Sequence, residues 1–517
     1  MSASKNGEGS KSSQVVSLRK TLREAVFVGA EDILASRCVD VAARCSPGDV
    51  FVPRVSAASD EHEQIDEAVR RGATAVVAER LLPVNIPQCL VEDSNEAFAI
   101  LSQQLAGGPS QRVLTIGVIG TNGKTTTSLF ISSVLKRLGG SVAYYTSLGS
   151  SDSIECDRTN NRPPSAGQLA SWMKKSLRAE APALVIELTE SMLKNRSTQG
   201  IEFDVLVVCG LRPNQVRGGA TSRRLTELLT SATKQLKDHG VLLYNADDAA
   251  VSRWVERGRI PAVSYGLDAA EHVRGKRLGR AGGQQQVLVS AGYLLMPMTL
   301  DIPGDHVARA ALASVALAWM FDLSVADAIA GAEALRTIPG RMERVHQAVD
   351  VPLFIDRGQT PDRLAAAMHA MRTHGLGATT VVCDVSSELN DATRTRLGEV
   401  LQKGASQVVL SGATVGAEAL QRLAMDVLGG FAAPGRVQVI GDREAAIAWA
   451  INNTTQGCIV LSGCGEREWV GRNGQMTTDQ ATARHLYSKR SQPLVFPNLK
   501  IFPPSEPTAF FPIDSTK

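Results

Sequence analysis

One segment constrains this chain more than any other: a short apolar run that leads directly into a glycine- and threonine-rich turn. Residues 113–119 read Val-Leu-Thr-Ile-Gly-Val-Ile, which is typical of a buried strand, and a helical stretch extends from the turn through Leu138. Backbone N–H groups in such a turn can surround phosphate oxygens, and the dipole of the following helix favours negative charge. We therefore predict a nucleotide-phosphate site formed by Gly120, Thr121, Asn122, Gly123, Lys124, Thr125 and Thr126.

The side chains of this turn indicate what it binds. Lys124 can reach the β- and γ-phosphates of a nucleotide as a point charge, and the Thr125 hydroxyl can ligate Mg²⁺. The spacing differs from the ordinary G-x-x-x-x-G-K-[ST] loop, because residue 118 is Val where that pattern has Gly. The alternative is a chance glycine-rich turn, but the strand before it and the helix after it argue against that interpretation.

Short β-branched runs alternate with helical stretches along the chain, which predicts an α/β fold. A doubly wound parallel sheet is predicted in the middle of the chain from strands at 113–119, 183–187, 205–209 and 241–244. A second, separate Rossmann-like sheet is predicted from strands at 353–356, 379–384, 407–410, 437–440 and 458–461. A small α/β unit precedes both sheets, with strands at 49–52 and 74–78 and a helix at 63–71 between them.

A length of 517 residues suggests about three domains. The predicted elements place an N-terminal domain at 19–110, a central nucleotide-binding domain at 111–340 and a C-terminal Rossmann-like domain at 341–491. Residues 1–18 are polar and are predicted to form a disordered tail. Residues 492–517 contain six prolines and predict an irregular tail. The alternative for this Pro- and Phe-rich tail is a docking peptide for a protein partner.

Composition argues against several classes of protein. The net charge of +3 is too small to indicate a nucleic-acid-binding protein. No stretch approaches the roughly 18 apolar residues that a membrane span needs, and residues 310–321 read instead as a buried helix. The first residues lack the apolar region of a secretory signal. The eight cysteines show no C-x-x-C spacing, which predicts free thiols and a cytoplasmic protein.

Several further motifs, together with Gly-Thr-Asn-Gly-Lys-Thr at 120–125, resemble those of the Mur ligase family. Residues 47–52 read Pro-Gly-Asp-Val-Phe-Val, residues 245–248 read Asn-Ala-Asp-Asp, and residues 339–345 read Pro-Gly-Arg-Met-Glu-Arg-Val. Within the family, the chain resembles most the UDP-N-acetylmuramoyl-tripeptide synthetase branch. The resemblance covers most of residues 39–470. It implies a small N-terminal UDP-binding domain, a central P-loop ATPase-like domain and a C-terminal Rossmann-like ligase domain.

The resemblance also implies an activity. Members of this family use ATP and Mg²⁺ to phosphorylate a carboxylate of a UDP-linked muramoyl peptide in peptidoglycan synthesis, and the amine of an amino acid then attacks the acyl phosphate. Lys124 and Glu187 correspond to catalytic residues, and Thr125 and Glu187 to ligands of Mg²⁺. A carboxylate at a strand end beside the loop suits Mg²⁺ in any case, although Glu187 could also be a solvated strand end. Arg341, at the junction to the third domain, could reach a phosphate from that side.

The chain departs from the family pattern at positions that carry chemistry. Gln215 replaces a metal-ligating histidine, and Val307 and Ala310 replace two asparagines that approach adenine. The carbamylated lysine of the family corresponds approximately to Lys234. These replacements predict weaker binding of a second metal ion and of adenine.

The third domain departs further, at residues 356–359, 412–415 and 463–467. The family has an arginine for the amino-acid carboxylate where this chain has 412–415. Three other arginines could take that role: Arg212, Arg357 and Arg467. Two interpretations follow from the sequence. The first is an ATP-dependent amide ligase, which the complete three-domain plan favours; the second is a catalytically impaired homologue that serves as a nucleotide-binding scaffold or regulator.

Overall fold

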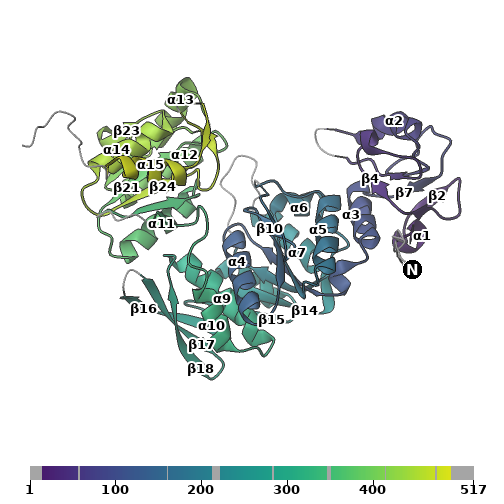
Figure 1. Cartoon of the computed structure of the whole chain (residues 1–517), viewed down its shortest axis with the longest axis horizontal. Coiled ribbons are helices and arrows are strands. Elements are labelled where there is room, and N and C mark those ends of the chain that lie inside the picture. The colour runs from purple at the N-terminus through teal and green to yellow at the C-terminus, as the bar shows by residue number, and fades with distance from the viewer. Residues whose placement is uncertain are drawn as a thin grey trace, which may run out of the picture.

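The computed structural model describes residues 14–490, except residues 56–58, 160, 212–221, 282–283, 346–350, 414 and 472–473. Three sheets follow one another along the chain, with helices packed on them (Figure 1). Each sheet contains parallel strands joined by helical connections, so the predicted α/β fold is confirmed. The three sheets fall within the ranges 19–110, 111–340 and 341–491. The exact domain boundaries stay a prediction.

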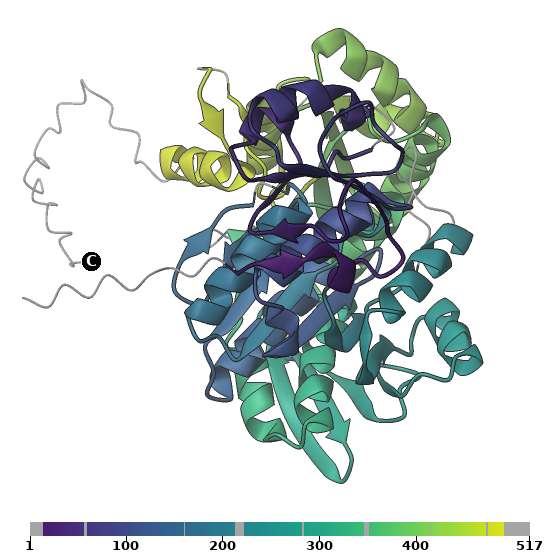
Figure 2. The same cartoon turned by 90° about the vertical axis from the view of Figure 1, so that its right-hand side faces the viewer.

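The N-terminal sheet is small and lies in front of the central one in Figure 2. Its strands, in spatial order, are β2 (Val26–Val28), β7 (Gln88–Leu90), β6 (Ala75–Ala78), β5 (Val50–Phe51) and β4 (Cys38–Val39). Helix α2 (Ile65–Arg70) packs on one face of this sheet, and α3 (Ser94–Leu105) packs on the other.

The start of the chain belongs partly to this N-terminal unit. Strand β1 (Val16–Ser17) pairs with β3 (Leu34–Ala35), and helix α1 (Leu18–Thr21) follows β1 directly. Leu18 is fully buried in the same apolar core as Phe98 of α3. The predicted tail at 1–18 therefore extends too far, because burial of Val16 and Leu18 fixes residues 16–18 in the fold.

The central sheet has eleven strands, and its middle is parallel. The parallel strands, in spatial order, are β9 (Val142–Tyr145), β12 (Ala183–Glu187), β8 (Leu114–Ile119), β13 (Phe203–Val208), β14 (Leu236–Asn245) and β15 (Ala262–Gly266). The predicted strands are confirmed. The antiparallel edges of the sheet were not predicted. They are β10 (Ser150–Ser151) and β11 (Cys156–Asp157) on one side, and β16 (Val273–Ala281), β17 (Gln284–Ala291) and β18 (Leu294–Leu300) on the other.

Helices cover both faces of the central sheet. One face carries α4 (Lys124–Arg137), α9 (Asp305–Met320) and α10 (Val325–Glu333). The other carries α5 (Ala166–Arg178), α6 (Glu190–Lys194), α7 (Ser222–Thr233) and α8 (Ala249–Arg257). Helix α9 is almost wholly buried because its core positions are mostly alanines, which lets it pack closely on the sheet. This confirms the buried helix predicted at 310–321.

The third sheet has six strands, and all but the first are parallel. Its strands, in spatial order, are β19 (Glu343–Val345), β20 (Leu353–Asp356), β24 (Cys458–Ser462), β21 (Thr379–Asp384), β22 (Gln407–Ser411) and β23 (Val437–Val439). One face packs on α11 (Pro361–Thr373), α12 (Asp391–Gly404) and α13 (Ala417–Leu428). The other packs on α14 (Arg443–Asn453) and α15 (Asp479–Arg490). A short hairpin, β25 (Trp469–Val470) and β26 (Met476–Thr477), lies beside α15.

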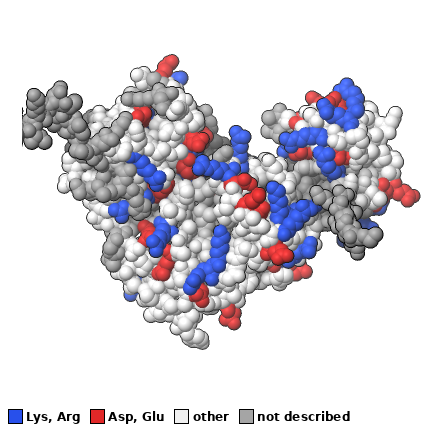
Figure 3. Space-filling view, in the orientation of Figure 1, with Lys and Arg blue, Asp and Glu red and all other residues white. Residues whose placement is uncertain are grey.

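The described part of the chain also tests the predictions about cysteines and membrane spans. All eight cysteines lie in this part and are free thiols, as predicted; Cys156 is exposed and the others are buried or half-buried. No helix among the described residues is long and apolar enough to cross a membrane. Basic and acidic side chains are intermixed on the face that Figure 3 shows. The Pro-rich tail at 492–517 lies outside the described residues.

Candidate nucleotide-binding site

The glycine-rich turn at 120–127 joins the carboxyl end of β8 to the start of α4. Gly120 and Gly123 both have positive φ angles, of 149° and 85°, which favour glycine. A Cβ on Gly120 would also lie 3.0 Å from the carbonyl oxygen of Gly210, so the turn passes close to the loop after β13. Among the described residues, no side chain caps the N-terminus of α4. Its first N–H groups therefore remain suited to an anion.

Lys124 is the first residue of α4 and folds back over the turn. Its Nζ donates a hydrogen bond of 2.8 Å to the carbonyl of Gly120. Burial lowers the pKa of Lys124, while the nearby carboxylate of Glu187 raises it. A bound phosphate would favour the charged ammonium in the same way, so the site suits an anion of high charge.

Three side chains with oxygen atoms that could bind a metal ion lie beside Lys124. Glu187 ends β12 and is only 5% exposed. Its Oε2 accepts hydrogen bonds from the Thr125 hydroxyl at 2.9 Å and from the backbone N–H of Ser147 at 2.8 Å. The hydroxyls of Thr125 and Ser147 are 3.0 Å apart. Mg²⁺ commonly binds one or two protein oxygens together with water and nucleotide phosphates, and this group of oxygens fits that preference.

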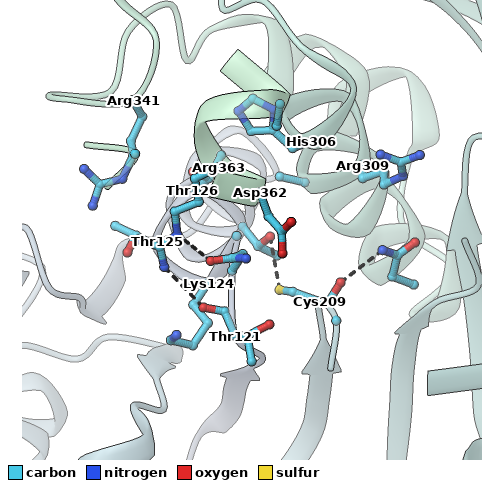
Figure 4. Close-up of a pocket in the computed structure, with 18 of the residues that line it drawn as sticks. Thr121, Lys124, Thr125, Thr126, Cys209, His306, Arg309, Arg341, Asp362 and Arg363 are labelled. Atoms are coloured by element: carbon cyan, nitrogen blue, oxygen red, sulfur yellow. Dashed lines mark hydrogen bonds between the residues drawn. The ribbon is translucent and has the colours of Figure 1, made fainter. Parts of the chain in front are cut away.

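The third sheet forms the opposite wall of a cavity of about 700 Å³. Arg341, Arg357 and Arg363 reach this wall, and Figure 4 shows Arg341 and Arg363 across the cavity from the strand that carries Cys209. Nη1 of Arg341 lies 2.9 Å from one carboxylate oxygen of Glu466, and Nη1 of Arg357 lies 2.8 Å from the other. Burial lowers the pKa of Arg357, and Glu466 partly offsets that effect. Two cations therefore share one carboxylate.

The far end of the cavity lies at the carboxyl ends of β14 and β15. Asp247 accepts hydrogen bonds from three successive backbone N–H groups, at 267–269. It also forms an ion pair with Arg309, in which Nε lies 2.6 Å from Oδ2 of Asp247. His306, in the first turn of α9, also lines this region, and burial lowers its pKa. Of the two positions where the family has asparagine, Ala310 lines the cavity, whereas Val307 is 1% exposed and packs in the core.

The structure brings most of the predicted site residues together in this cavity. The lining includes Thr121, Asn122, Gly123, Lys124, Thr125, Thr126, Glu187 and Arg341. Gly120 contributes through its carbonyl, which accepts the bond from Lys124. Their roles toward a nucleotide and Mg²⁺ stay predictions.

The assignment of Lys234 as the carbamylated-lysine equivalent is wrong in this structure. Lys234 follows the end of α7 and is exposed. The carbonyl of its neighbour Gln235 accepts a hydrogen bond from the N–H of Phe203, which begins β13. The cavity lies at the other end of that strand, beside Cys209. Lys234 therefore lies at the amino ends of the parallel strands, whereas the phosphate loop lies at their carboxyl ends.

The three arginines suggested for the amino-acid carboxylate, and Gln215, have different outcomes. Arg357 lines the cavity, as its suggested role requires. Arg467 instead donates a hydrogen bond of 2.7 Å to the carbonyl of Gly463. Gln215 and Arg212 lie outside the described residues.

Sequence reasoning missed Arg363 and the pair formed by Arg309 and Asp247. Arg363 directly follows the run Thr360-Pro-Asp362 and lies in the first turn of α11. The available signal was a basic residue just after a Thr-Pro pair, which is typical of the start of a helix. Arg309 carried no such signal, because α9 reads as an apolar helix with one charged residue in its second turn.

Fold and site together define an α/β protein with a P-loop-like turn, whose cavity is lined on the opposite side by residues of a second parallel sheet. Two family models match the chain: the Mur ligase middle domain at residues 118–318, and the Mur ligase glutamate ligase domain at residues 340–465. The chain belongs to the Mur ligase family.

Curated relatives and solved structures agree with this assignment. The chain is 26% identical over 458 residues to the UDP-N-acetylmuramoyl-L-alanyl-D-glutamate–2,6-diaminopimelate ligase of Geobacillus thermodenitrificans, covering 86% of this chain and 93% of the relative. It is 23% identical to the ligase of the same name from Bacillus cereus, covering 86% and 92%. A solved ligase of that name superimposes with a TM-score of 0.68 at 18% identity, covering 93% of this chain and all of that one. MurF ligase of Thermotoga maritima in complex with ADP gives 0.62 at 20% identity, covering 88% and 97%.

Proposed function

We propose that this protein is an ATP-dependent Mur-type ligase that joins an amino acid to a carboxylate of a UDP-linked muramoyl peptide, through an acyl phosphate, in peptidoglycan precursor synthesis. The relatives named above are ligases that act on UDP-N-acetylmuramoyl-L-alanyl-D-glutamate, which is the first substrate to test. We expect the protein to act in the cytoplasm, where ATP is available.

One observation carries this proposal: the contact between Thr125 and Glu187 beside Lys124. A hydroxyl and a carboxylate 2.9 Å apart, next to a half-buried lysine and an uncapped helix N-terminus, make a site suited to a metal-bound triphosphate. Mg²⁺ bound to Thr125 and Glu187 would neutralise phosphate charge during transfer. The scaffold alternative receives no comparable support, because the relatives that match over most of the chain are named as ligases.

The chain's own residues would act mainly by positioning and by charge. In the first step a carboxylate oxygen of the acceptor bonds to the γ-phosphorus of ATP, the bond to the bridging oxygen of ADP breaks, and Lys124 holds the phosphate oxygens. In the second step the amine nitrogen attacks the carbonyl carbon, phosphate leaves, and a proton of the amine passes to solvent. The cavity between two sheets keeps the reacting groups together and limits access of water.

The incoming amino acid is the least determined substrate. At the family's arginine position the described residues are Gly412, Ala413 and Val415, and none of them offers a guanidinium. The N–H of Ala413 donates to the carboxylate of Asp384, a buried residue at the end of β21, at 2.7 Å. We therefore expect weak or no turnover with meso-diaminopimelate, whose carboxylates need a bidentate cationic partner.

The test is release of ADP and phosphate by the purified full-length protein. ATP, Mg²⁺ and UDP-N-acetylmuramoyl-L-alanyl-D-glutamate are supplied with a panel of amino acids, and the amide product is identified by mass spectrometry. We expect product with at least one amino acid, loss of product in Glu187→Gln, and full activity in Glu180→Gln, whose side chain is exposed before β12. A protein that binds ATP but forms no amide with any amino acid would support the scaffold alternative instead.

A further inference from the structure

Arg363, in the first turn of α11, links the third sheet to the phosphate loop. Its Nη2 donates to the carbonyl of Thr121 at 3.4 Å, and its Nε donates to the side-chain oxygen of Asn122. The loop lies 241 residues earlier in the chain and belongs to the central sheet. One half-buried guanidinium therefore spans the two sheets at the phosphate loop (Figure 4).

Among the described residues, no carboxylate contacts Arg363 directly, and Asp356 and Glu187 offset its charge only from a distance. Arg341 and Arg357 share Glu466, but within the described residues no acidic side chain forms an ion pair with Arg363. Burial, together with the positive charges of Arg341 and Arg357, lowers the pKa of Arg363 to about 10. A desolvated cation whose hydrogen-bond acceptors are all neutral is costly to keep, and an anionic ligand would offset that cost.

The position of Arg363 indicates which part of a ligand it would meet. Lys124 lies on the same loop and is close enough to Arg363 for the guanidinium to lower its pKa. An anion between these two side chains would have a cation on each side. The loop N–H groups hold the inner phosphates of a nucleotide, so the group that projects toward the third sheet is the terminal phosphate.

We propose that Arg363 binds the terminal phosphate of ATP and thereby couples the third sheet to the presence of a triphosphate. The guanidinium exchanges the neutral oxygens of Thr121 and Asn122 for two charged phosphate oxygens, which form stronger, bidentate hydrogen bonds. ADP lacks this phosphate and leaves Arg363 on the loop. During transfer, the same guanidinium stabilises negative charge on the phosphoryl group that is transferred. This inference rests on the proposed function, because it takes ATP as the ligand.

The test compares triphosphate with diphosphate binding in the full-length protein. Calorimetric titrations use the Mg²⁺ complexes of ADP and of AMPPCP, an ATP analogue that is not hydrolysed. We expect Arg363→Ala to weaken AMPPCP binding about 10- to 100-fold, the range for hydrogen bonds to charged groups, and to leave ADP binding close to wild type. Arg363→Lys keeps the charge but not the two parallel N–H groups, so its affinity for AMPPCP should lie between those of wild type and Arg363→Ala. The matched control is Arg372→Ala, because Arg372 is exposed in the last turn of the same helix.

The outcomes separate this inference from the function on which it rests. If Arg363→Ala weakens the binding of AMPPCP and ADP equally, or weakens neither, the role of Arg363 is overturned while the ATP site stays in place. If Arg363→Ala does not fold, the AMPPCP-to-ADP preference of Arg363→Lys decides, and an unchanged preference overturns the role. If Lys124→Ala binds AMPPCP and ADP as tightly as wild type, the loop is not the nucleotide site and the proposed function itself fails.

Discussion

The hydroxyl of Thr125 lies 2.9 Å from the carboxylate of Glu187, although the two residues are 62 positions apart in the chain. Strand β12 pairs in parallel with β8, with Glu187 beside Val118, so the end of β12 reaches the turn that begins at residue 120. The backbone N–H of Ser147 holds the same carboxylate oxygen. The geometry of neighbouring parallel strands thus places the acid beside the phosphate loop.

Glu187→Gln should lower the Mg²⁺-dependent part of nucleotide affinity without unfolding the protein. The amide keeps the size of the side chain and can still accept the bonds from Thr125 and Ser147, but it loses the charge that attracts Mg²⁺. We expect ADP affinity at saturating Mg²⁺ to fall roughly 10- to 100-fold, as for other interactions with charged groups. The measurement is calorimetric titration of ADP at several Mg²⁺ concentrations, with Glu180→Gln as control. An unchanged Mg²⁺ dependence would leave Glu187 with a purely structural role at the strand end.

The parallel strands and the phosphate loop could be predicted because their signals are local. A β-branched run followed by Gly120–Thr127 identifies a strand, a turn and a helix without knowledge of distant contacts. On one of the two antiparallel edges, strand β16 was missed for a physical reason. Residues 273–281, which form β16, read Val-Arg-Gly-Lys-Arg-Leu-Gly-Arg-Ala, and a run so rich in glycine and arginine gives little strand signal. The strand forms by antiparallel pairing with β17, the next strand along the chain, and its own composition does not show that pairing.

The site could be predicted only on the side of the central sheet. Arg363 is one of 55 lysines and arginines, and its contact with Asn122 depends on how two separate sheets meet. Lys234 was assigned by spacing along the chain, but α7 carries it to the opposite end of the sheet from the loop. Spacing along a chain locates residues within one element well; it does not locate them across a crossover connection.

His306 should make the protein less stable at mildly acid pH. Burial lowers its pKa below 6.5, and Arg309 lowers it further, although Asp356 and Asp305 act in the opposite direction. The unfolded chain therefore binds a proton near pH 6.5 that the folded protein takes up only at lower pH. Stability contributed by neutral His306 is present above pH 6.5 and is lost as the pH falls through the folded-state pKa. Denaturant unfolding between pH 5 and 7.5 should show a shallower pH dependence in His306→Asn than in wild type, and identical slopes would contradict the assignment.

Asp479→Asn should strongly destabilise the C-terminal sheet. Both side chains of the ion pair between Arg443 and Asp479 are fully buried, with Nη2 and Oδ2 2.7 Å apart. Trp469 also donates from its ring nitrogen to Asp479 at 3.1 Å. Removing one partner leaves an uncompensated buried charge, which typically costs about 3–5 kcal/mol. The measurement is urea unfolding followed by circular dichroism.

The control for this change is an exposed ion pair. Glu468 lies 3.8 Å from Arg158, and both side chains are more than half exposed, so Glu468→Gln should change the free energy of unfolding by only about 0–1 kcal/mol. A cost for Asp479→Asn as small as that of the control would show that the buried pair contributes little beyond its packing.

Mg-ATP alone should compact this protein only slightly, and Arg341→Ala should remove whatever compaction occurs. A ligand shifts a conformational equilibrium only by its different affinities for the two states. The third sheet already contacts the phosphate loop through Arg363, and Arg341 is held by Glu466, so ATP gains few new contacts by closing the cavity further. Arg341→Ala removes one of the two cations on Glu466 and weakens the wall that faces the nucleotide. Small-angle scattering of the full-length protein with and without Mg-ATP measures the change in the radius of gyration. A large compaction that survives Arg341→Ala would show both that the contact at Arg363 is not the closed arrangement and that Arg341 does not couple the third sheet to ATP.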